Sequence, residues 1–173
     1  MNSEKLTKAD VKKIQDEINE RKTVLRPKIL EDVKSARAQG DLSENFEYYA
    51  ARKANRENNS RIEYLEKMLK HATIIEEVSN GGVSLNNTVK VKFVEVGVDE
   101  TSWEIDTYKI VTSIRADSMK NRVSIESPLG RALLSHVVDE IVKVELENGT
   151  SYELKIIEID TTTDSSEDDI KAF

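Results

Sequence analysis

The chain has 173 residues, of which 38% are hydrophobic and 34% charged, and it contains no cysteine. Disulfides and thiolate metal sites are therefore excluded, and two histidines are too few for a histidine-rich metal centre. No apolar run reaches the roughly 18 residues that a membrane span needs, and the N-terminus lacks an apolar signal core. We therefore expect a cytoplasmic protein with no membrane partner.

The formal net charge of −7 is unevenly distributed along the chain. Residues 1–75 carry a net charge of +3, whereas residues 76–173 carry −10. A protein that binds free nucleic acid by itself usually has a strongly basic domain. We therefore expect any contact with nucleic acid to be local or to be made inside a larger complex.

The first half of the chain has the pattern of two long helices. Apolar residues recur at steps of three, four or seven over residues 7–39, which predicts an amphipathic helix. Pro27 lies inside this stretch and removes one backbone hydrogen bond, so it predicts a kink. A second helix is predicted over residues 43–71, and its polar stretch 53–60 is expected to be the least stable part.

The two predicted helices are joined by a short connection. Gly40 can adopt the left-handed conformation that ends a helix, and Asp41 or Ser43 can cap the next one. Because so short a connection forces the helices to run antiparallel, residues 1–78 are predicted to form a coiled-coil hairpin. At 1.5 Å per residue, each arm is roughly 45 Å long.

The pattern changes to alternation with period two after the hairpin. Several short alternating segments follow, and the Asn-Gly pair at 148–149 predicts a tight β-hairpin. Residues 128–135 read as a short helix that begins at Pro128. We predict an α+β protein, in which residues 79–160 form a small antiparallel β domain with one short helix. Residues 161–173 are acidic and polar, and a disordered tail is predicted there.

The tip of the hairpin contains two acids and three aromatic residues. Asp41 and Glu44 are three residues apart, so their carboxylates can share one Mg²⁺, which is often held by only one or two protein carboxylates. The same spacing is also found in an ordinary helix start, where the helix dipole favours acids. Phe46, Tyr48 and Tyr49 can stack on RNA, but Phe46 and Tyr49 fit better as side chains that close the last layer of the hairpin.

Six basic residues lie near the tip, namely Lys34, Arg37, Arg52, Lys53, Arg56 and Arg61. They can neutralise phosphates of a single strand or stack on its bases. They can equally form a solvated helix face with ion pairs such as that between Lys53 and Glu57. The chain has no phosphate-binding glycine loop, nucleophile–base pair or zinc pattern. We therefore do not expect an autonomous enzyme or an intrinsic cofactor.

Two sequence segments resemble one family closely. Residues 40–48, with the sequence GDLSENFEY, resemble the Gre family of transcript cleavage factors, and residues 127–134, SPLGRALL, resemble its C-terminal signature. The resemblance covers about residues 5–160, and details of the second helix favour the GreA branch.

The resemblance implies a fold and a mechanism. It implies an N-terminal coiled coil and a C-terminal domain similar to FKBP prolyl isomerases, which docks at the mouth of the secondary channel of bacterial RNA polymerase. The hairpin then enters the channel and helps hold Mg²⁺ at the polymerase active site, where the backtracked polymerase cleaves its own transcript near the nascent RNA 3′ end. A monomer that assists the polymerase without being an enzyme itself is expected.

The resemblance also implies roles for individual residues. Asp41 and Glu44 take the catalytic, metal-assisting positions, and the tip is unlike that of the family's inhibitory relatives. Arg37 and Arg52 match basic positions near the RNA, and Lys53 and Arg56 extend that patch. Two further residues match positions that contact the polymerase, and these are Glu126 and Pro128.

The sequence departs from the family pattern at three sites and leaves two alternative functions open. Where the family commonly has a Val-Gly pair and then Glu-Ala-Asp, this chain has Val111-Thr112-Ser113 and Arg115-Ala116-Asp117, and Val138-Asp139 replaces a later glycine-aspartate pair. These departures bear on docking more than on fold. The first alternative is a non-cleaving regulator that occupies the same channel. The second is an FKBP-like isomerase or chaperone, which would need an aromatic-lined pocket.

Overall fold

A computed structural model describes residues 4–38, 45–76 and 81–171 of the chain. The chain divides into two compact units, one built on Ala9–Thr73 and the other on Lys5–Lys8 together with the chain from Ile74 onward. Each unit has its own core. Within the described residues, no helix has the length and the apolar character that crossing a membrane requires.

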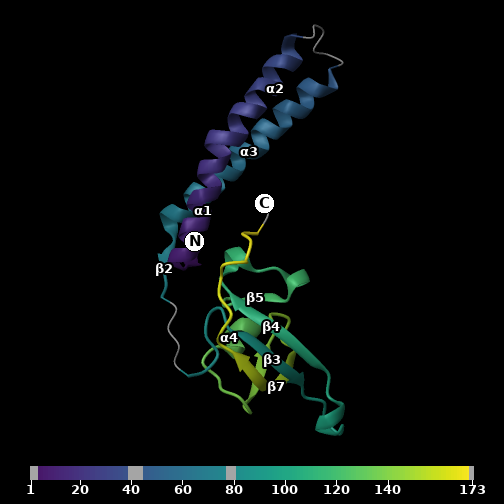
Figure 1. Ribbon diagram of the computed structural model, residues 1–173. Helices are drawn as coiled ribbons and strands as arrows, with labels where there is room; N and C mark the ends of the chain where they lie inside the picture. Colours follow the sequence, from purple (N-terminus) through teal and green to yellow (C-terminus); the bar gives the residue numbers. More distant parts are fainter. Residues whose placement is uncertain (1–3, 39–44, 77–80, 172–173) are drawn as a thin grey trace. The chain divides into compact units, whose positions relative to one another are not determined.

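The first unit is an antiparallel helical hairpin (Figure 1). Its first arm consists of α1 (Lys8–Glu20), a π-helical turn η1 (Arg21–Leu25) and α2 (Arg26–Ala38), and its second arm is α3 (Phe46–His71). The arms meet through a narrow apolar stripe, as expected for a long, solvated hairpin. The buried apolar side chains of this stripe include Ile14, Ile29, Ala36, Ile62, Leu65 and Met68.

The π-helical turn lies immediately before Pro27. The N–H of Arg26 donates to the carbonyl of Arg21, five residues earlier instead of four. A proline inside a helix lacks an N–H and clashes with the carbonyl four residues before it, and a widened turn relieves this conflict. Where the sequence predicted a kink at Pro27, the structure has a π-helical turn.

A polar layer joins the two arms near the middle of the hairpin. Arg61 is 4% exposed and donates to both carboxylate oxygens of Glu17, at 2.8 and 2.9 Å. Asn58 is 2% exposed, accepts from Arg21 Nη1 at 3.2 Å and donates to the Arg21 carbonyl at 3.3 Å. Partial burial opposes ionisation of Glu17, but hydrogen bonds and charge from both arginines hold its pKa below the usual value. The predicted weak stretch 53–60 therefore contributes a buried contact between the arms.

The second unit is built on a five-stranded sheet with the order β5-β4-β3-β7-β6. Its strands are β3 (Thr88–Phe93), β4 (Ile105–Val111), β5 (Arg122–Ser124), β6 (Ile141–Glu145) and β7 (Ser151–Asp160). Shorter elements of the described chain are β1 (Lys5–Leu6), β2 (Thr73–Ile74), η2 (Glu100–Ser102), η3 (Ser113–Arg115), η4 (Ser118–Lys120) and α4 (Pro128–Leu133).

The sheet is antiparallel, as predicted, except at one edge. β5 pairs with β4 in parallel, with Lys109 opposite Arg122 and Val111 opposite Ser124. The two 3₁₀ turns η3 and η4 lie between these strands and return the chain to Lys109, within β4, so that β5 runs in the same direction as β4. Alternation of apolar residues shows which face of a strand is buried but not its direction.

The core of this unit lies on one face of the sheet. Alternate strand residues point into it, as in β6, where Val142 and Val144 are buried between exposed neighbours. Leu133 of α4 is fully buried in the same cluster. The remaining buried members are Val83, Val89, Val91, Ile110, Ile125, Leu154 and Ile156. The short helix is therefore held to the sheet by its apolar side.

The C-terminal segment, residues 161–171, differs from the predicted disordered tail. It packs on the sheet unit, and Asp168 is only 6% exposed. The Asp168 carboxylate accepts from Arg115 Nη1 at 2.7 Å and from Lys109 Nζ at 2.9 Å. An acidic composition predicts disorder only when the acids lack buried partners, and here two cations of the sheet unit supply them.

The charge of Asp168 predicts a pH dependence of stability. Burial opposes its ionisation, yet hydrogen bonds and charge from Lys109 and Arg115 hold the pKa of Asp168 below its ordinary value. A lowered pKa in the folded state stabilises the fold above the unfolded-state pKa of about 4, and this stability is lost as the pH falls through the folded-state value. We expect Asp168→Asn to lower the free energy of unfolding at pH 7 by roughly 1–3 kcal/mol.

Urea unfolding between pH 7 and pH 2.5 measures this effect. The difference between the wild type and Asp168→Asn should shrink as the pH falls below about 4. Glu167→Gln is the matched control, because Glu167 is an exposed neighbouring acid. A difference that stays constant over the whole range would contradict the prediction.

Candidate functional site

The far end of the hairpin, where α2 ends and α3 begins, contains most of the predicted site residues. Asp41 and Glu44 themselves lie outside the described residues, so their predicted metal-assisting role stays a prediction. Elsewhere in the described chain, no three His, Asp or Glu side chains cluster closely enough to hold a metal ion.

Asn45 joins the ends of the two arms and starts α3. Its side-chain oxygen accepts from the N–H of Tyr48 at 3.0 Å, and its side-chain nitrogen donates to the carbonyl of Ala36 in α2 at 2.8 Å. Asn45 is therefore the N-cap, and the predicted caps Asp41 and Ser43 are wrong. The sequence could have indicated Asn45 as the N-cap, because asparagine caps helices as well as aspartate or serine does.

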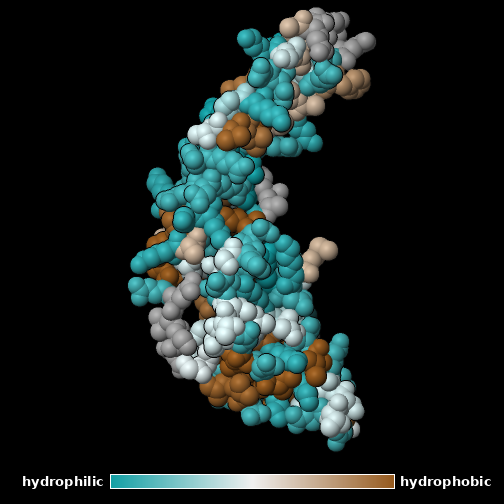
Figure 2. Space-filling model, in the orientation of Figure 1, coloured by the Kyte–Doolittle hydropathy of each residue, from teal (hydrophilic) through white to brown (hydrophobic). Residues whose placement is uncertain are grey.

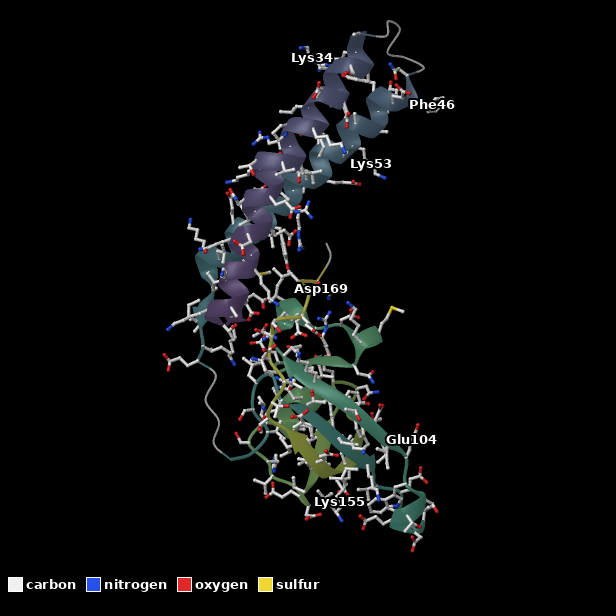
Figure 3. The ribbon with its side chains drawn as sticks, in the orientation of Figure 1. Lys34, Phe46, Lys53, Glu104, Lys155 and Asp169 are labelled. Carbon is white, nitrogen blue, oxygen red and sulfur yellow. The ribbon has the colours of Figure 1, made fainter. Side chains whose placement is uncertain are left out.

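Tyr48 is the aromatic residue that packs between the arms at this end. It is 8% exposed, whereas Phe46 is 87% and Tyr49 54% exposed. The prediction that Phe46 and Tyr49 close the last layer is therefore wrong. Because α3 begins at Phe46, its first turn directs Tyr48 toward α2, while Phe46 projects away from the hairpin (Figure 3).

Arg37 and Arg52 come from opposite arms and meet at Tyr48. Their guanidinium carbons lie 5.6 and 5.7 Å from the centre of the Tyr48 ring, within the range of a cation–π interaction. A hydrogen bond from Arg37, together with the charges of both arginines, lowers the pKa of the Tyr48 hydroxyl. The structure thus brings two of the predicted RNA-binding residues together on one ring.

The other two residues predicted to bind RNA, Lys53 and Arg56, lie farther along α3. Lys53 is exposed and lies 3.7 Å from Glu57, the ion pair that the sequence allowed as an alternative. Arg56 is also exposed. Figure 3 shows Lys53 on the outer side of α3, one to two turns from its start. These two side chains extend the basic surface without joining the group at Tyr48.

The electrostatic coupling at Tyr48 can be measured directly. Because the hydrogen bond and charge of Arg37 favour the ionised phenol, Arg37→Gln is expected to raise the pKa of Tyr48. The titration of the tyrosine ring carbons in NMR spectra measures this shift. Lys53→Gln removes a nearby charge of the same sign and should leave the Tyr48 titration almost unchanged. Equal shifts in both variants would contradict a specific contact with Arg37.

Glu126 and Pro128, the residues predicted to contact the polymerase, lie on one turn of the sheet unit. The Ser127 hydroxyl accepts from the N–H of Gly130 at 3.0 Å and thereby caps α4, which starts at Pro128. Ser113 Oγ donates to Glu126 at 3.3 Å. A Cβ on Gly130 would lie 2.0 Å from the Ser124 carbonyl oxygen, so only glycine allows this close approach. Glu126 and Pro128 are therefore held, half-buried, on a rigid turn.

Exposed apolar side chains occur on both units, and in the hairpin they include Val24, Leu30 and Phe46. Figure 2 shows a mostly hydrophilic hairpin and hydrophobic residues gathered on part of the sheet unit. The exposed apolar residues of this unit include Val96, Val98, Ile105, Val137, Val138, Ile141 and Leu146. Contiguous exposed apolar surface marks sites of protein–protein contact.

Comparisons with known proteins agree over both units. Residues 4–74 match the N-terminal family model of the transcription elongation factors GreA and GreB, and residues 78–161 match the C-terminal model. The chain is 44% identical over 156 residues to transcription elongation factor GreA of Caldanaerobacter subterraneus, covering 89% of this chain and 95% of the relative. It is 39% identical over 155 residues to GreA of Staphylococcus epidermidis, covering 89% and 94%.

A solved structure is similar at a lower level. The GreA factor homolog 1 of Thermus thermophilus is 23% identical, covers 91% of this chain and 99% of its own, and superposes with a TM-score of 0.42. The assignment rests on the sequence matches, which span nearly the whole chain outside its C-terminal segment. The chain therefore belongs to the GreA/GreB family of transcription elongation factors.

Proposed function

We propose that this elongation factor binds bacterial RNA polymerase in its secondary channel and stimulates the polymerase's own Mg²⁺-dependent cleavage of backtracked transcripts. The observation that carries the proposal is the meeting of Arg37 and Arg52 on Tyr48, directly beside the connection that contains Asp41 and Glu44. Two cations next to two acids, at the end of a thin hairpin, suit a phosphate chain and a metal ion in a deep cavity.

Each residue group has a distinct part in this proposal. Asp41 and Glu44 would offer hard carboxylate oxygens to a Mg²⁺ ion of the polymerase active site, and the ion would supply water activation and charge stabilisation. Arg37 and Arg52, held in place by Tyr48, would bind phosphates near the nascent RNA 3′ end, and Lys53 and Arg56 would extend this surface. The factor supplies groups to the reaction, and the polymerase remains the enzyme.

The sheet unit would supply the binding energy. Glu126 and Pro128 lie on a turn that cannot move freely, so their contacts with the polymerase would cost little ordering entropy. The exposed apolar residues of the same unit suit a protein partner. The proposal includes a monomeric factor that acts in the cytoplasm, where bacterial polymerase transcribes.

A transcript cleavage assay tests the proposal. Purified bacterial polymerase is stalled in a backtracked state on labelled RNA, and the wild-type factor is added with and without Mg²⁺. Release of short 3′ fragments well above the factor-free rate, only with Mg²⁺, is the expected result. Binding without added fragments would instead favour a non-cleaving regulator of the secondary channel, and absence of binding would overturn both functions.

A further inference from the structure

One end of the five-stranded sheet is strongly acidic. The β3–β4 connection and the β6–β7 connection both lie there, because Phe93 at the end of β3 pairs with Leu154 near the start of β7. Residues 92–108 and 143–155, which contain these connections and the adjoining strand ends, include eight acidic residues and three lysines. Glu104 marks this end of the unit in Figure 3. A net charge of −5 repels nucleic acid and attracts a basic partner.

Three aromatic side chains lie on the core face of the sheet at the same end, and we call Phe93, Tyr108 and Tyr152 the aromatic group. Tyr108 pairs with Val89 and Tyr152 with Val144, and both valines are fully buried core residues. The rings of Phe93 and Tyr152 stack with their centres 5.9 Å apart and an interplanar angle of 29°. All three residues pack against the core but are only half-buried, so they border the surface of the unit.

Asp106 adds a carboxylate to the aromatic group. It lies two residues before Tyr108 in β4 and therefore on the same face of the sheet. The Tyr108 hydroxyl donates to Asp106 Oδ2 at 2.7 Å, and the N–H of Thr107 donates to Oδ1 at 3.0 Å. Among the described residues, no lysine or arginine forms an ion pair with this half-buried carboxylate. Two accepted bonds leave lone pairs on both oxygens, so Asp106 can bind a cation from outside the chain.

The acidic and aromatic groups gather around the Tyr108 hydroxyl. Burial raises the pKa of this hydroxyl, and so do the hydrogen bond to Asp106 and the charges of Asp106, Tyr152 and Glu104. The hydroxyl therefore stays neutral and continues to donate to Asp106. Two acids and the Tyr152 hydroxyl thus lie near enough to influence one phenol, which places them on one small part of the surface.

We propose that this end of the sheet unit binds a basic segment of a partner protein, with one arginine or lysine side chain resting on the Phe93 and Tyr152 rings and its charge at Asp106. Aromatic rings attract cations through their electron-rich faces. Arginine and lysine also have apolar stems that pack on such rings while the charged head reaches a carboxylate. The exposed apolar residues Val98 and Leu146, in the two connections, give the segment further contacts.

This surface is separate from the turn that carries Glu126 and Pro128. Val111, at the end of β4, pairs with Ser124, only two residues before Glu126, whereas Asp106 lies at the beginning of β4. The length of β4 thus separates the two surfaces, and both can be occupied at once. The inference goes beyond the proposed function and does not depend on it.

Binding of a basic peptide to the full chain tests the proposal. The probe is a fluorescent peptide of alternating arginine and leucine residues, and a matched peptide has glutamine in place of each arginine. We expect the wild type to bind the arginine peptide and the Asp106→Asn chain to bind it roughly tenfold more weakly, because the cation loses its charged partner. Asparagine still offers an oxygen to the Tyr108 hydroxyl, so the fold is retained.

Glu153→Gln is the matched control for loss of charge. Glu153 is exposed between Tyr152 and Leu154, so it lies on the opposite face of the sheet from the aromatic group. Its replacement removes the same charge from the same end of the unit and should weaken binding by no more than about twofold, since exposed charges are screened.

The contribution of the rings is tested at Tyr152. Tyr152→Leu removes the ring and should weaken binding of the arginine peptide about fivefold, whereas Tyr152→Phe keeps the ring and should bind as the wild type does. The NMR signals of the Phe93 and Tyr108 ring carbons should shift when the arginine peptide binds. Circular dichroism confirms that each variant is folded. Unchanged binding by Tyr152→Leu would overturn the proposed contact between the cation and the rings.

Three further results would overturn the proposal. Equal binding of the arginine and glutamine peptides would show an unspecific apolar surface. Equal losses in Asp106→Asn and Glu153→Gln would show a response to net charge without a site at Asp106. Absence of binding of the arginine peptide to the wild type would exclude a basic ligand at this end of the sheet.

Discussion

Replacing Asp41 and Glu44 together by alanine is expected to reduce fragment release by backtracked polymerase at least a hundredfold, while binding to polymerase persists. The two carboxylates are proposed to assist a metal ion, and loss of groups that stabilise developing charge typically costs about 10²–10³ in rate. The sheet unit, which carries Glu126 and Pro128, is unchanged in this variant. Cleavage is measured by gel analysis of labelled transcripts, and binding by competition for polymerase.

A matched variant separates the metal role from general charge loss. Glu47 is an exposed acid in the first turn of α3, and Glu47→Gln removes one negative charge close to the tip. This variant should retain most of the cleavage stimulation. Unchanged cleavage by the Asp41→Ala/Glu44→Ala chain would remove the proposed mechanism, whereas equal losses in both variants would point to overall charge instead of a metal contact.

Glu17→Met is expected to destabilise the hairpin by roughly 3–5 kcal/mol, the cost of removing one partner of a buried ion pair. Arg61, whose side chain is 5% exposed, would lose both of its hydrogen bonds to Glu17. Thermal and urea unfolding followed by the helical circular dichroism signal measure this change.

Two further chains test that interpretation. Lys22→Ala breaks an ion pair with Glu66 whose side chains are 45% and 49% exposed, and should cost less than about 1 kcal/mol. Glu17→Met combined with Arg61→Leu replaces the buried pair by apolar groups and should recover most of the lost stability. A Glu17→Met chain as stable as the wild type would show that water replaces the lost partner.

The hairpin could be predicted from the sequence, because helical periodicity reports both the existence of a helix and its buried face. The alternating pattern after the hairpin likewise predicted strands, and in β6 it accompanies the burial of Val142 and Val144. At the end of the hairpin where α3 begins, periodicity placed the buried face of the helix on the wrong residues. It assigned Phe46 and Tyr49 to the interface, whereas the cap at Asn45 sets the start of α3 so that Tyr48 lies inside.

Other features depend on contacts between residues that are distant in sequence. Arg115 looks like a surface cation until Asp168, 53 residues later, is placed against it. The composition of the C-terminal segment predicts disorder because composition does not record such a partner. The parallel pairing of β5 is similarly set by the turns η3 and η4, which carry no alternation pattern.

The polar layer also determines the axial alignment of the two arms. Apolar side chains along a stripe can pack almost equally well after a slip of one helical turn, about 5.4 Å, but a buried ion pair cannot. Such a slip would separate Arg61 from Glu17, which lies in α1. It would also move Arg37, near the end of α2, away from Tyr48. The contact between Glu17 and Arg61 therefore also affects the far end of the hairpin, and a substitution there can impair the proposed function without changing any residue of the proposed site.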